Sequence, residues 1–83
     1  MLRINFKNNN GYAAYRTIRE NDKVDINATH VFRERNYKGE YITRARRLTD
    51  QGPWAAANYM RAVHKNGGFI EYLGTPTGIT SND

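Results

Sequence analysis

The side chains that most often carry out catalysis are few and scattered in this sequence. The two histidines, His30 and His64, lie far apart, and neither has a second ligand at metal-binding spacing. The eight carboxylates form no acid and base pair on one predicted face, the single serine is Ser81, and cysteine is absent. The sequence therefore predicts a protein that is not an enzyme and has no metal site and no cofactor.

Positive charge is the most informative chemical feature. Thirteen Lys and Arg against eight Asp and Glu give a net charge of +5, and the excess is concentrated in residues 30–47. A planar guanidinium can hold a phosphate or a carboxylate through two parallel hydrogen bonds. We therefore expect a polyanion partner, nucleic acid first. The candidate nucleic-acid-binding residues are Arg33, Arg35, Lys38, Arg44, Arg46, Arg47 and Tyr37.

Two further interpretations stay open at this stage. The basic side chains of residues 30–47 can simply be a solvated face that protects a sheet edge from aggregation. Trp54 can close the end of a helix over a sheet, or it can be an exposed anchor for a protein partner, with Arg61 and Lys65 along the same helix face.

These residues need strands and a helix to position them. Leu2, Ile4 and Phe6 alternate with polar residues, which predicts a strand over 2–7, followed by an Asn-Gly type I′ turn and a second strand over 12–18. Helical spacing allows a helix over 11–20 instead, which would give a ferredoxin-like βαββαβ order.

Residues 29–35 and 40–48 predict a hairpin around the turn 36–39. With Arg35 opposite Glu40, one face carries the apolar side chains and the other carries Arg33, Arg35, Arg44 and Arg46. A shift of one residue would mix the two kinds on both faces, which is unfavourable because an unpaired buried charge is costly.

The best-supported element is a helix over 53–65, with Thr49 and Asp50 as capping residues, Pro53 at the first position and Gly67-Gly68 at the end. A last strand over 69–73 follows. The expected organisation is one domain over 1–74 and a flexible tail over 75–83.

The expected fold class is α+β, a small antiparallel sheet of four to five strands with one helix packed on one face. The strand, turn, strand and helix order over 29–65 loosely resembles the small DNA-binding domains of phage integrases, although no motif is matched. No segment is apolar over the roughly 20 residues that cross a bilayer, so we expect no membrane partner and a cytoplasmic location.

The function expected first is a small basic protein that contacts nucleic acid phosphates through the arginine hairpin. The alternative is an inhibitor, of the kind used by phages and mobile elements, that docks on an acidic surface of a host protein or defence complex. A structural subunit is a weaker third candidate.

Overall fold

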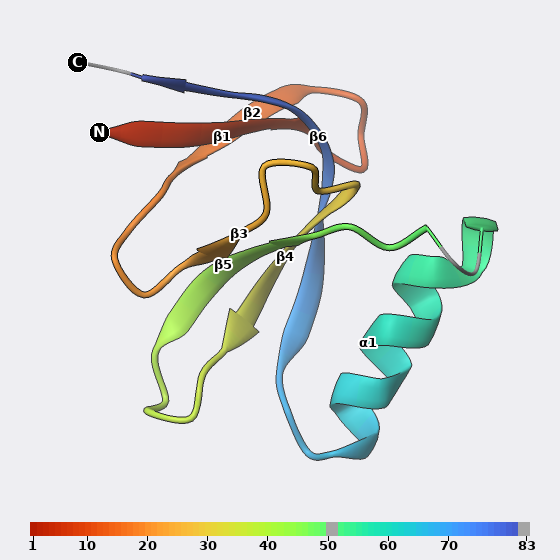
Figure 1. Ribbon diagram of the computed structural model, residues 1–83. Helices are drawn as coiled ribbons and strands as arrows, with labels where there is room; N and C mark the ends of the chain where they lie inside the picture. The colour runs from red at the N-terminus through yellow and green to blue at the C-terminus, as the bar shows by residue number, and fades with distance from the viewer. Residues whose placement is uncertain (50–51, 82–83) are drawn as a thin grey trace.

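The computed structural model describes residues 1–49 and 52–81, which form a curled β-sheet with a helix on its outer face (Figure 1). The strands are β1 (Leu2–Lys7), β2 (Ala13–Thr17), β3 (Lys23–Val24), β4 (His30–Arg35), β5 (Tyr41–Arg46) and β6 (Ile70–Ser81). A 3₁₀ turn, η1 (Gly52–Trp54), leads into the helix α1 (Ala55–Lys65).

The described residues make an α+β domain with one α-helix and a six-stranded mixed sheet of order β2-β1-β6-β4-β5-β3. The fold class is confirmed, but the expected four to five antiparallel strands fall short, because β3 adds a short parallel pair with β5. The ferredoxin-like alternative is wrong, since residues 13–17 pair with β1 as a strand.

The long strand β6 joins the two halves of the sheet. Its first part pairs with β4, and residues 75–81, which the sequence places in a flexible tail, pair with β1. At the bend lies Gly74, where a Cβ would come within 2.1 Å of the Lys7 carbonyl oxygen. Glycine is required for this close approach, so the glycine and proline here mark a bent strand. Residues 82–83 lie outside the described part of the chain.

The β4–β5 hairpin is present, but its register differs by one residue from the expected one. Arg35 pairs with Tyr41, and not with Glu40. The loop causes this shift in register. The Asn36 N–H donates to the Glu40 carbonyl, which leaves residues 37–39 as a three-residue loop that ends in Gly39 at φ 81°. A type I turn followed by a left-handed glycine inserts one extra residue into one strand.

The same turn occurs twice. In the β4–β5 loop the N–H of Gly39 donates to the Asn36 carbonyl, and in the β1–β2 loop the N–H of Gly11 donates to the Asn8 carbonyl. Each asparagine side chain also accepts two backbone N–H groups of its own loop. The expected type I′ turn is therefore wrong, because Asn10 has no positive φ.

The shifted register divides the basic side chains between two faces. Directly opposed residues of antiparallel strands share a face, and Arg33 opposes Thr43 whereas Phe32 opposes Arg44. The outer face, toward α1, carries Phe32, Glu34, Arg44 and Arg46, and the inner face carries Arg33, Arg35, Tyr41, Thr43 and Ala45. The expected single face with four arginines is wrong.

The buried side chains form a layer on each face. The inner layer consists of Ile4, Phe6, Val31 and Ala45. On the outer face the fully buried Phe32 meets the rings of Tyr59 and Tyr72 at centroid distances of 5.0 and 5.6 Å. Among the larger apolar and aromatic side chains, Ile4, Phe6, Phe32 and Ile70 are buried, Tyr59, Met60 and Val63 are partly buried, and Leu2 and Phe69 are exposed.

The end of the helix follows its local signal, but the start does not, because Trp54 occupies the N-cap position without a side-chain cap hydrogen bond and Thr49 lies outside the helix. Its end has the expected glycine motif, because Gly67 donates its N–H to the His64 carbonyl and Gly68 donates to the Val63 carbonyl. Pro53 lies in η1, just before the helix, and Asp50 of the expected cap lies outside the described residues. Within the described chain, no helix is both long and apolar enough to cross a membrane.

Candidate nucleic-acid interface

The inner-face arginines are engaged in contacts within the protein. Arg33 Nε lies 2.6 Å from Glu71 Oε1, and its guanidinium lies 4.9 Å from the Tyr41 ring centroid and 5.2 Å from that of Phe69. Arg35 Nε donates to a carbonyl of the hairpin loop at 3.3 Å. The ion pair with Glu71 reduces the positive charge that this face presents to a ligand.

Two more of the predicted nucleic-acid-binding residues, Tyr37 and Lys38, lie at the tip of the β4–β5 hairpin. Tyr37 is 93% exposed, and the Lys38 ammonium lies 5.7 Å from its ring centroid. A cation over an exposed ring contributes only about 0.5–1 kcal/mol. These two side chains are therefore accessible but are not built into a concave site.

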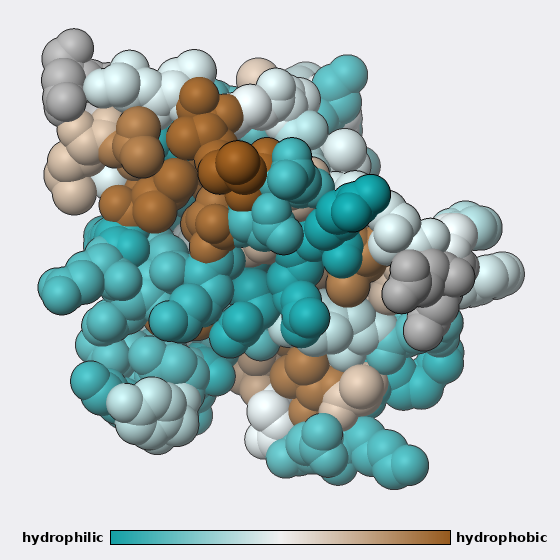
Figure 2. All heavy atoms as spheres, in the orientation of Figure 1, coloured by the Kyte–Doolittle hydropathy of each residue, from teal (hydrophilic) through white to brown (hydrophobic). Residues whose placement is uncertain are grey.

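Three predicted cations come together at the end of β5. Arg44, Arg46 and Arg47 line a hollow of about 450 Å³ together with Lys23. Arg46 and Arg47 also line an adjoining hollow of about 330 Å³, whose other wall is α1 with Tyr59. We call these two hollows the β5 groove. Figure 2 shows hydrophilic side chains across this side of the molecule and a hydrophobic patch near the two chain termini.

Lys23 is a member of the groove that the sequence analysis missed. Strand β3 lies parallel to β5 at the sheet edge, with Lys23 opposite Arg44 (Figure 1). The alternation that begins at Val24 indicates a strand, but it does not indicate which strand is its neighbour. The position of Lys23 in the groove therefore depends on the pairing of β3 with β5, which are separated in the sequence.

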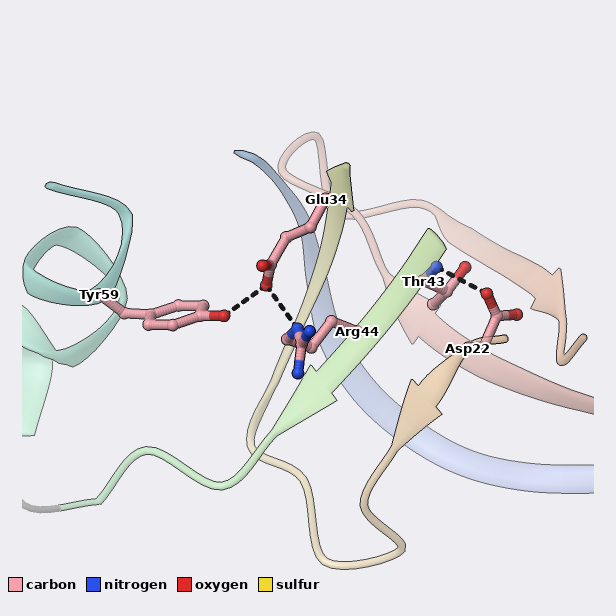
Figure 3. Close-up of polar contacts among 5 residues, drawn as sticks. All are labelled: Asp22, Glu34, Thr43, Arg44 and Tyr59. Atoms are coloured by element: carbon pink, nitrogen blue, oxygen red, sulfur yellow. Dashed lines mark hydrogen bonds and ion pairs between the residues drawn. The ribbon is translucent and has the colours of Figure 1, made fainter. Parts of the chain in front are cut away.

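A buried carboxylate holds Arg44 in place. Glu34 Oε2 accepts a hydrogen bond from the Tyr59 hydroxyl at 2.5 Å and lies 3.0 Å from Arg44 Nε (Figure 3). The Glu34 side chain is 10% exposed, whereas that of Arg44 is 31% exposed. This contact is an ion pair that lacks hydrogen-bond geometry at Nε, and the carboxylate neutralises in part the charge that Arg44 brings to the groove lining.

Tyr59 also supports Arg46. The Arg46 guanidinium lies 4.7 Å from the Tyr59 ring centroid. Burial raises the pKa of Tyr59 above its ordinary value, and the hydrogen bond to Glu34 raises it further. The ring therefore stays neutral near pH 7 and provides a π-face for the cation.

The groove keeps an excess of positive charge. Lys23, Arg46 and Arg47 are exposed, and none of them forms an ion pair within residues 1–49 and 52–81. Asp25 contributes one carboxylate to the lining, and its Oδ1 accepts the N–H of Asn27. Three unpaired cations around a hollow suit an anionic ligand with several charges.

The helix residues proposed for a protein partner lie outside this groove lining. Trp54 is 69% exposed at the start of α1, so the interpretation that it closes the helix end as a core residue is wrong. Arg61 and Lys65 are also exposed, and Arg61 donates to Asn58 Oδ1 at 3.2 Å.

In the described part of the chain, no cluster of three or more His, Asp or Glu side chains could hold a metal ion. No protein-family model, curated protein or solved structure matches the chain. The function of the protein is therefore inferred from the geometry and the charges of these surfaces.

Proposed function

We propose that the protein binds nucleic acid through phosphate contacts in the β5 groove. The observation that carries the proposal is the convergence of Arg46 and Arg47 on two adjoining hollows, with Lys23 lining one of them and none of the three forming an ion pair within the described residues. Phosphate contacts of this kind position a protein on the backbone and carry no sequence information. The expected binding is therefore general and strongly dependent on salt.

The groove cations differ in how they can contribute. Arg46 is supported on the Tyr59 ring and Arg47 is exposed, so both can reach a phosphate at little cost in reorganisation. Arg44 is already paired with Glu34, so it contributes mainly to the shape of the groove. Replacing Arg44 would disturb the fold as well as the surface, and it is a poor choice for a binding test.

The proposal is tested by titrating labelled mixed-sequence duplex DNA with wild type, Arg46→Ala and Arg47→Ala at several salt concentrations. The slope of log affinity against log salt should decrease in magnitude by about 0.9 for each phosphate that the variant no longer neutralises. Lys38→Ala at the hairpin tip is the matched control, because it removes the same charge outside the groove. It should leave the slope unchanged.

Two results would contradict the proposal. One is the absence of wild-type binding even at low salt. The other is an equal loss of slope in Lys38→Ala and Arg46→Ala, since the charge of the whole protein, and not the groove, would then account for binding.

The exposure of Trp54 favours a second candidate function, inhibition of a protein partner by docking. A large aromatic side chain that is 69% exposed is a potential binding anchor. A protein partner captured from lysate should remain bound after nuclease treatment and should dissociate faster from Trp54→Ala, whereas loss of capture on nuclease treatment would contradict this candidate. The rim cations Arg61 and Lys65 should then affect mainly the rate of association.

A further inference from the structure

We propose a second, independent site in this protein, a pocket for a nucleoside phosphate at the seam where β2 faces the start of β5. A hollow of about 460 Å³ lies there and shares no lining residue with the β5 groove. Its volume falls in the range of small-molecule pockets. The lining residues that could bind a ligand are Arg16, Arg19, Asp22, Tyr41 and Thr43.

Tyr41 supplies the aromatic surface of the hollow. It is 55% exposed and lies on the inner face of the sheet with Thr43. Arg16 belongs to the same face, because it opposes the buried Ile4 on β1. Tyr15 also lines the hollow, but it opposes Asn5, so its ring lies on the other face, where the Arg3 guanidinium is 4.1 Å from its centroid. A half-exposed ring on the same face as a cation suits stacking with a planar base.

The same hollow contains both cations and a fixed acceptor. Arg16 and Arg19 can hold a phosphate. Asp22 Oδ2 accepts the Arg19 N–H at 2.7 Å, and its Oδ1 accepts the Thr43 N–H at 2.9 Å (Figure 3). A carboxylate has about four acceptor positions, so Asp22 retains capacity for a sugar hydroxyl or a base amine.

These groups together define the class of ligand. A planar ring can stack on Tyr41, hydrogen-bond donors can bind Asp22, and an anionic group can bind Arg16 and Arg19. The negative charge of Asp22 disfavours a second anion beside it, so the phosphate belongs at the arginine side and the base or sugar at Asp22. A nucleoside phosphate has all three parts, either as a free nucleotide or as an unpaired nucleotide in a single strand.

The test is an NMR titration of the protein with adenosine monophosphate and, separately, with a short single-stranded oligoadenylate. Backbone amides of residues 15–22 and 41–43 should shift and saturate. Tyr41→Ala should weaken binding by about tenfold, because its ring can no longer stack on the base, and Tyr41→Phe should keep most of the affinity. Tyr12→Ala is the matched control, since Tyr12 is 69% exposed on the β1–β2 hairpin but does not line the hollow.

The two ligands distinguish a free nucleotide from an unpaired nucleotide in a strand. Binding of the mononucleotide identifies a free nucleotide as sufficient, and binding of the oligonucleotide alone identifies an unpaired nucleotide in a strand. Absence of binding by both ligands at millimolar concentration overturns the proposal, as does an equal effect of Tyr41→Ala and Tyr12→Ala. Arg46→Ala should leave mononucleotide binding unchanged, so the groove and the pocket can fail separately.

Discussion

Replacing Arg44 should destabilise the fold more than breaking the shorter ion pair on the opposite face. Arg44→Ala leaves Glu34, with a side chain that is 10% exposed, without its cation but with the Tyr59 hydrogen bond. Removing one partner from a fully buried pair costs about 3–5 kcal/mol. Because Arg44 is 31% exposed and the Tyr59 donor remains, we expect a loss of about 1–3 kcal/mol in the free energy of unfolding.

The matched control is Glu71→Ala, which breaks the ion pair with Arg33. The N–O distance of that pair is only 2.6 Å, but its side chains are 33% and 48% exposed. Exposed pairs contribute about 0–1 kcal/mol, so this change should cost less than Arg44→Ala. The comparison separates burial from distance as the cause of stabilisation.

Urea unfolding at pH 7 measures both changes, with the m-value as a check that the unfolded states are comparable. A second measurement adds Glu34→Gln to Arg44→Ala, and the double variant should lose less than the sum of the two single losses because no unpaired carboxylate remains. A cost for Glu71→Ala equal to that of Arg44→Ala, together with additive losses in the double variant, would show that burial of the Glu34 carboxylate is not the source of the larger loss.

Three further changes test the fold. Gly74→Ala should lower the thermal midpoint clearly more than Gly78→Ala, because a Cβ meets the Lys7 carbonyl at the first position and has nothing within 4 Å at the second; equal shifts would contradict the bend. Burial lowers the pKa of His30 below 6.5, so the unfolded chain binds a proton at a higher pH than the folded chain does. The free energy of unfolding should therefore fall as pH drops below 6.5, and this fall should be smaller in His30→Gln. The raised pKa of Tyr59 makes the free energy of unfolding fall as pH rises above 10, and urea titrations of Tyr59→Phe should show a smaller fall.

The sequence predicted the elements that depend on local signals. The helix ends where Gly67 and Gly68 close it, and the hairpin forms where β-formers flank Gly39. These features are encoded within a few residues.

The division of the arginines between two faces and the composition of the groove depend on residues that are far apart in the sequence. An all-basic face looked favourable because a mixed face would bury unpaired charge, but Glu34 and Glu71 supply a partner on each face. Lys23 joined the groove through pairing with β5, and β6 extended through its glycines because β1 was available as a neighbour. None of these partners is visible in a local pattern.

The proposal that nucleic acid binds in the β5 groove is tested most directly by mapping the surface that nucleic acid contacts. Backbone amide shifts would be recorded for wild type on addition of a short mixed-sequence duplex at low salt. The account predicts shifts in residues 23–25, 44–48 and 58–62, which surround Lys23, Arg46 and Arg47, and their disappearance at high salt. Shifts confined to residues 33–38 of the hairpin, or no shifts at all, would contradict it.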